Sequence, residues 1–133
     1  MSNPKRVIWF SADTEPAPAQ VAELRRLFPR CSIITVLDRW GSVDAIIDKF
    51  NELEGDEMVA VIPLAMIRML TQRGYSVLWT MMEQVYGPRE DWDIASEKHG
   101  RVKKYRFDGF LRLKRIRMVF EKIEPEPDVF GED

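Results

Sequence analysis

The sequence predicts an α/β domain over residues 1–123, of Rossmann-like three-layer type, with a mainly parallel four-stranded sheet, a C-terminal antiparallel hairpin and an acidic flexible tail over 124–133. Short runs of consecutive apolar residues alternate with segments of helical periodicity, as in parallel sheets covered on both faces. The length of 133 residues and the apolar content of 45% suit one domain with its own core. The alternation requires crossover connections, which place helices on the faces of the sheet.

The first half of the chain is predicted to contain two strands, each followed by a helix. Residues 6–11 and 31–37 are aromatic and β-branched runs typical of buried strands. Two prolines suit the first turn of a helix over 16–28, because the amide donor that proline lacks is not used there. Ser42 is a good N-cap for the second helix, whose apolar residues recur at helical spacing over 42–53.

The third strand is predicted over 58–62, the most uniformly apolar run in the chain, and is expected at the centre of the sheet. Pro63 can begin a helix, and Gly74 supplies its stop. Residues 75–82 then form the fourth predicted strand.

The pattern changes after residue 85. Residues 87–101 are polar and show no periodicity, so an exposed loop is expected there. Residues 102–122 are predicted to form the antiparallel hairpin, since Asp108-Gly109 accepts the positive φ angles of a tight type I′ turn.

The composition excludes several classes of protein. A formal net charge of −2 gives the chain no general attraction for duplex nucleic acid. Cys31 and His99 are single, which excludes an internal disulfide or a Cys/His zinc site within one chain, so no metal is expected. The longest uncharged apolar run, 58–67, is too short to span a bilayer, and no secretory signal precedes it. We therefore expect a cytoplasmic protein with no membrane contact.

The candidate ligand site is the edge of the sheet where the parallel strands end, because ligands of open parallel sheets bind there. No dinucleotide, P-loop or nucleophile-elbow motif is present, so no cofactor is expected. Polar and aromatic residues that follow the predicted strands are the candidate ligand-binding residues: Ser11, Asp13, Thr14, Asp38, Arg39, Trp40, Thr80 and Glu83. The alternative is that these side chains serve as helix caps and surface ion pairs.

A second candidate is the basic C-terminal hairpin, represented by Arg112, Lys114 and Arg117. Basic groups beside aromatic rings hold single-stranded nucleic acids through phosphate attraction and base stacking. The alternative is the solvent face of an edge strand, where lysine and arginine prevent edge-to-edge aggregation. The same surface would also suit an acidic protein partner.

Two segments of the chain form a further pattern. The first is Val7-Ile8-Trp9-Phe10-Ser11, and the second runs from Val59-Ala60-Val61-Ile62-Pro63-Leu64 through Gly74 to Val77-Leu78-Trp79. Together they resemble small CRISPR-associated, CARF-related proteins of Rossmann-like fold, a group that includes sensors and ring nucleases for cyclic oligoadenylate. The resemblance implies a cyclic nucleotide ligand and a homodimer with a shared groove at the strand ends.

One departure from that group bears on catalysis. Its members carry Ser-Arg-His after the first strand, whereas here Ser11 is followed by Ala12 and Asp13. The resemblance therefore implies binding without cleavage, or an acidic variant in which Ser11, Thr14 or Arg39 assists by positioning and charge stabilisation. The leading prediction is a nucleotide-binding domain, whether or not it is an enzyme. The alternatives are a non-enzymatic protein-interaction module and RNA binding through the basic hairpin.

Overall fold

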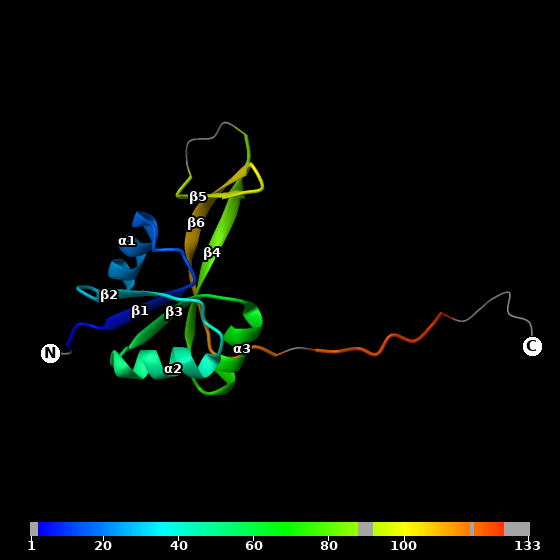
Figure 1. Cartoon of the computed structure of the whole chain (residues 1–133), viewed down its shortest axis with the longest axis horizontal. Helices are drawn as coiled ribbons and strands as arrows, with labels where there is room; N and C mark the ends of the chain where they lie inside the picture. Colours follow the sequence, from blue (N-terminus) through cyan, green and yellow to red (C-terminus); the bar gives the residue numbers. More distant parts are fainter. Residues whose placement is uncertain (1–2, 88–91, 118, 127–133) are drawn as a thin grey trace, which may run out of the picture.

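The computed structural model describes residues 3–87, 92–117 and 119–126. Its elements alternate along the chain as a mixed α/β domain requires (Figure 1). In chain order they are β1 (Arg6–Ser11), α1 (Pro18–Leu27), β2 (Ser32–Leu37), α2 (Val43–Glu52), β3 (Glu57–Val61), α3 (Leu64–Gln72), β4 (Val77–Val85), β5 (Ile94–Lys98) and β6 (Arg101–Leu113).

The described strands form one curled sheet in the order β2-β1-β3-β4-β6-β5 (Figure 1). Strands β2, β1, β3 and β4 are parallel, whereas β6 is antiparallel to β4 and β5 is antiparallel to β6. The predicted α/β class and its parallel strands are confirmed. The sheet has six strands instead of four, because β6 pairs with β4 and β5 pairs with β6, so the C-terminal strands extend the same sheet.

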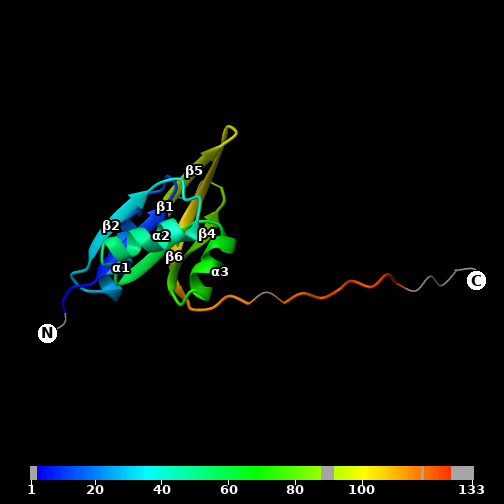
Figure 2. The same ribbon diagram turned by 60° about the horizontal axis from the view of Figure 1, so that its bottom comes forward.

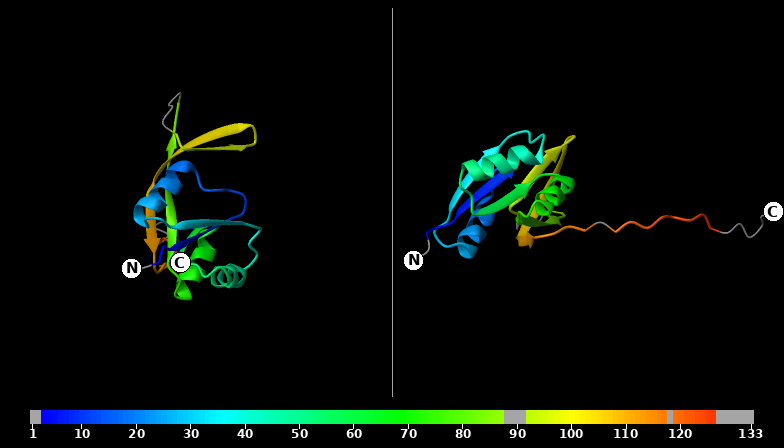
Figure 3. Two further views of the ribbon diagram at one scale, coloured as in Figure 1. Left: turned by 90° about the vertical axis from the view of Figure 1, so that its left-hand side faces the viewer. Right: turned by 90° about the horizontal axis from the view of Figure 1, so that it is seen from below.

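Helices cover both faces of the sheet (Figures 2 and 3). On one face, Ile46 of α2 and Ile67 of α3 pack with Phe10 of β1, and all three side chains are fully buried. On the other face, Leu24 of α1 packs against Trp9. The chain runs outward from β1 to β2 but returns across β1 to β3 and β4. Right-handed crossovers therefore place α1 opposite α2 and α3.

The predicted turn at Asp108-Gly109 is wrong, because both residues lie inside the continuous strand β6. Gly109 has a φ of 100°, and the pairing of β4 with β6 shifts register at this point, between Thr80 and Met82. Asp-Gly accepts positive φ in a bulge as readily as in a turn. Long-range pairing with β4 decides between the two.

The hairpin lies elsewhere, between β5 and β6. Its two-residue tip is His99-Gly100, with φ angles of 54° and 72°, as a type I′ turn requires. Strand β5 falls within residues 87–101, so the expectation of a loop throughout that range is wrong. Residues 88–91 of that predicted loop lie outside the described residues.

The described residues after β6 contain no strand, so the predicted hairpin does not extend to residue 122. This C-terminal segment leaves the sheet beside α3 and runs away from the domain as an extended chain (Figures 1 and 2). Among the described helices, none has the length and apolar character needed to cross a membrane.

Candidate functional site

The loop after β1 is ordered by its own hydrogen bonds. Ser11 is buried, and its Oγ accepts a hydrogen bond from the Thr14 amide at 3.1 Å. The Trp9 Nε1 donates to the Thr14 carbonyl oxygen at 2.8 Å, and the Thr14 hydroxyl donates to Asp13 at 3.1 Å. The Ser11 hydroxyl therefore stabilises a turn. Of the three ligand-binding residues predicted in this loop, Ser11, Asp13 and Thr14, only Thr14 lines the cavity described below.

Gln20, in the first turn of α1, joins that helix to β4. Its side chain is buried; Oε1 accepts from the Ala17 amide at 2.8 Å, and Nε2 donates to the Thr80 Oγ1 at 2.9 Å. The Thr80 hydroxyl in turn faces the Met82 Sδ at 3.7 Å. Because a thioether is a weak acceptor, the Thr80 hydroxyl remains able to turn toward a ligand.

These residues border an apolar cavity of about 180 Å³ at the carboxyl ends of the parallel strands. An apolar cavity of this size suits a small flat ring system, since an engineered apolar cavity of about 150 Å³ holds benzene. A few polar groups among apolar walls are typical of ligand pockets. We call this cavity the ring pocket. Its lining residues are Trp9, Thr14, Gln20, Val61, Thr80, Met82, Ile94 and Tyr105.

A basic hollow of about 550 Å³ adjoins the ring pocket at Tyr105, which lines both. Arg101, Lys103 and Tyr105 alternate along β6, so their side chains share one face of the hairpin. Neither Arg101 nor Lys103 forms an ion pair with a residue in the described ranges. His99 and Ser96 complete the lining of this hollow, here called the hairpin hollow.

The residues predicted after β2 lie elsewhere. Trp40 packs edge-on against Phe10 with ring centroids 5.2 Å apart, as part of the core beneath α2 and α3, on the opposite face from the ring pocket. Asp38 and Arg39 are exposed, and the Asp38 carboxylate accepts from the Arg39 amide at 2.7 Å. At β4, Glu83 is exposed and forms an ion pair with Arg106. The structure thus brings together Thr14 and Thr80, and leaves these four outside both cavities.

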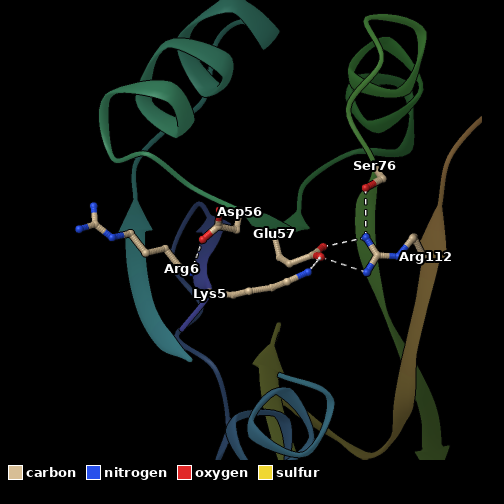
Figure 4. A network of polar contacts seen from close by, with 6 residues as sticks. All are labelled: Lys5, Arg6, Asp56, Glu57, Ser76 and Arg112. Carbon is tan, nitrogen blue, oxygen red and sulfur yellow. Dashed lines mark hydrogen bonds and ion pairs between the residues drawn. The ribbon is translucent and has the colours of Figure 1, made fainter. Parts of the chain in front are cut away.

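Arg112 of the basic group is engaged at the opposite edge of the sheet, where the parallel strands begin (Figure 4). Its guanidinium donates to both carboxylate oxygens of Glu57, at 2.7 and 3.2 Å, and to the Ser76 hydroxyl at 3.2 Å. Lys5 adds a third contact to Glu57 at 3.1 Å. Arg112 therefore contributes to a structural ion-pair network.

Glu57 is the centre of this network, with only 6% of its side chain exposed. Burial alone would raise the pKa of its carboxyl group. Hydrogen bonds from Arg112 and Lys5, together with their positive charges, outweigh burial and hold the pKa below its usual value.

Lys114 and Arg117 are exposed. They lie with Arg115 around a third hollow, of about 460 Å³, whose other wall is α3 with Thr71 and Gln72. We call this the α3 hollow.

The described residues hold no group of three or more His, Cys, Asp and Glu side chains that could bind a metal ion. Cys31 is buried, and burial raises the pKa of its thiol, which lowers its reactivity as a nucleophile.

Comparison with known protein families, with curated proteins and with solved structures finds no match to this chain. The fold and the geometry of the three hollows are therefore the basis for the functional argument.

Proposed function

We propose that the chain binds a nucleotide at the carboxyl edge of its sheet, with the base in the ring pocket and the phosphate in the hairpin hollow. The observation that carries this proposal is the position of Tyr105, which lines the apolar pocket and the basic hollow at once. A nucleotide has the same division, since its flat ring system is bonded through a sugar to an anionic group.

The architecture supports this location. The strand order reverses between β1 and β3, and Rossmann-like sheets bind ligands outside the carboxyl ends of their strands at such a reversal. Trp9 of β1, Thr14 in the loop after it, and Val61 of β3 all contribute to the ring pocket. Arg101 and Lys103 would supply the positive charge that phosphate oxygens attract.

The resemblance noted for the first and third strands makes cyclic oligoadenylate the nucleotide to test first. We propose binding without cleavage, because the Ser11 hydroxyl is occupied within its own turn and Arg39 lies outside both cavities. Of the residues expected to assist cleavage, Thr14 alone borders the proposed site.

The test is a titration of the full chain with AMP, cyclic tetra-adenylate and cyclic hexa-adenylate, followed by calorimetry and by chromatography of the nucleotide. We expect saturable binding, an unaltered nucleotide, and at least about a tenfold loss of affinity in Lys103→Glu, since a removed phosphate contact costs on the order of 1.4 kcal/mol. Arg25→Glu on α1 is the matched control, because it reverses an exposed charge that lines neither cavity.

Three results would contradict the proposal. Absence of heat with every nucleotide at millimolar concentration would remove the site altogether. Equal affinity in Lys103→Glu and Arg25→Glu would remove the hairpin hollow as the phosphate site. A linear product would show cleavage and replace the proposed binder with an enzyme.

A further inference from the structure

The described residues 114–117 and 119–126, here called the C-terminal arm, expose an unusual amount of apolar surface. Val119, Phe120 and Ile123 are 94%, 82% and 90% exposed. Ile116, near the start of the arm, still packs against the core beneath α3. Exposed apolar side chains gathered in one extended segment mark an interaction site. The arm therefore has the character of a strand that needs a partner.

The charges of the arm follow one another in blocks. Lys114, Arg115 and Arg117 come first, and Glu121, Glu124 and Glu126 follow Val119, with one cation, Lys122, among them and 4.0 Å from Glu124. If two arms run antiparallel with Val119 opposite Val119, then Arg117 lies opposite Glu121. In the same register Lys114 lies opposite Glu124, so opposite charges face each other across the pair. The arm is complementary to a second copy of itself.

The α3 hollow offers the second half of this contact. It is lined by residues of the arm, Lys114, Arg115, Ile116, Arg117 and Val119, and by residues of α3, Arg68, Thr71 and Gln72. A second arm in the antiparallel register carries its acidic half to this hollow. A two-stranded ribbon alone is only marginally stable in water, so contact with the hollow supplies what the ribbon lacks.

We propose that two copies of the chain associate through their C-terminal arms, paired antiparallel about Val119, with the acidic half of each arm against the α3 hollow of the other copy. Pairing covers Val119 and joins each basic block to an acidic block. This contact is separate from the nucleotide site and does not depend on it.

The first test is a charge exchange in the full chain, followed by multi-angle light scattering after gel filtration. The wild type is expected to show twice the 15.6 kDa mass of one chain at high micromolar concentration. Arg117→Glu and Glu121→Arg should each shift the population to the monomer, because each places two pairs of like charges face to face. The double variant restores opposite charges in both pairs and should recover the dimer.

The second test is disulfide formation at the two-fold axis. In Val119→Cys the two thiols lie directly opposite each other, within reach of a disulfide. In the control Ile123→Cys, which is almost equally exposed, the two thiols are separated by eight residue spacings, roughly 26 Å. Mild oxidation should therefore link the Val119→Cys chains and leave the Ile123→Cys chains single.

A monomeric wild type at high micromolar concentration would overturn the proposal, as would equal cross-linking of the two cysteine variants. Failure of the double variant to recover the dimer would exclude the register. Single-stranded RNA is the competing occupant of the α3 hollow. If RNA binds the wild type, is lost in Arg117→Glu, and no dimer is present, the hollow is a nucleic-acid site instead.

Discussion

Glu57 is a buried carboxylate whose two partner residues, Lys5 and Arg112, come from segments distant in the sequence. Lys5 precedes β1 and Arg112 lies near the end of β6, yet both contact Glu57 (Figure 4). Arg112 also donates a hydrogen bond to Ser76, which precedes β4. A buried charge of this kind is tolerated only when paired. The network therefore ties β6 to the amino edge of the parallel strands.

Replacement of Glu57 should destabilise the domain. In Glu57→Gln, Arg112 and Lys5 lose their anionic partner, and we expect a loss of about 1–3 kcal/mol in the free energy of unfolding. Urea denaturation followed by circular dichroism measures this loss. Glu54→Gln is the control, because Glu54 also pairs with an arginine but is 80% exposed, and its replacement should have little effect. Equal losses in the two variants would contradict the role of burial.

The same carboxyl group makes stability depend on pH. Because the folded pKa of Glu57 is lowered, its contribution is complete above the usual glutamate value and is lost as the pH falls through the folded pKa. Denaturation from neutral pH down to about pH 3 should show this loss in the wild type. Glu57→Gln should lose less stability over that range, and parallel curves would contradict the assignment.

At the scale of elements, β6 shows how a local signal can serve two structures. Asp108-Gly109 is the strongest short-range turn signal in the chain, yet both residues continue one strand. The bulge at Gly109 lets the strand pair with β4 on both sides of the register shift. It also keeps Tyr105, Phe107 and Phe110 on the face toward α1, since the register shift compensates the change of parity.

Gly109→Ala should weaken this element. A φ of 100° disfavours any side chain, and we expect a loss of about 1–2 kcal/mol in the free energy of unfolding. Gly41→Ala is the matched control, because Gly41 has open space around it and no positive φ. Thermal unfolding of both variants measures the difference. An unchanged Gly109→Ala would show that the bulge relaxes without cost.

At the scale of the whole molecule, the proposed nucleotide site is assembled from both halves of the chain. Trp9, Gln20 and Val61 come from the parallel half, and Ile94 and Tyr105 from the hairpin that curls beyond β4 (Figure 3). Neither half alone encloses the ring pocket. A ligand there should therefore connect regions that are otherwise linked through β4.

Hydrogen exchange tests that connection. If a nucleotide bridges the ring pocket and the hairpin hollow, its addition should slow amide exchange in residues 11–20 and 94–105 together. The amino-edge segment around Glu57 should be unaffected, which makes it an internal control. Protection confined to one of the two regions would contradict a shared site.

The sequence by itself determined the elements of the parallel half. Apolar runs and helical spacing depend on neighbours within a few residues, so β1, β2, β3 and the helices between them could be placed from the chain alone. The polar edge after the strands could be predicted for the same reason, and Thr14 and Thr80 lie at the ring pocket. Gln20 was missed, although a polar residue one turn before Leu24 on the apolar stripe of α1 was a usable signal.

Tertiary structure alone decided which of these residues meet. Strand order, the pairing of β6 with β4, and the position of the hairpin tip at His99-Gly100 depend on contacts between residues far apart in sequence. Those contacts placed Tyr105 between a pocket and a cationic hollow, and they paired Arg112 with Glu57. The physical reason is that backbone preference and periodicity are local, whereas burial and charge pairing are decided only when the strands have paired into the sheet.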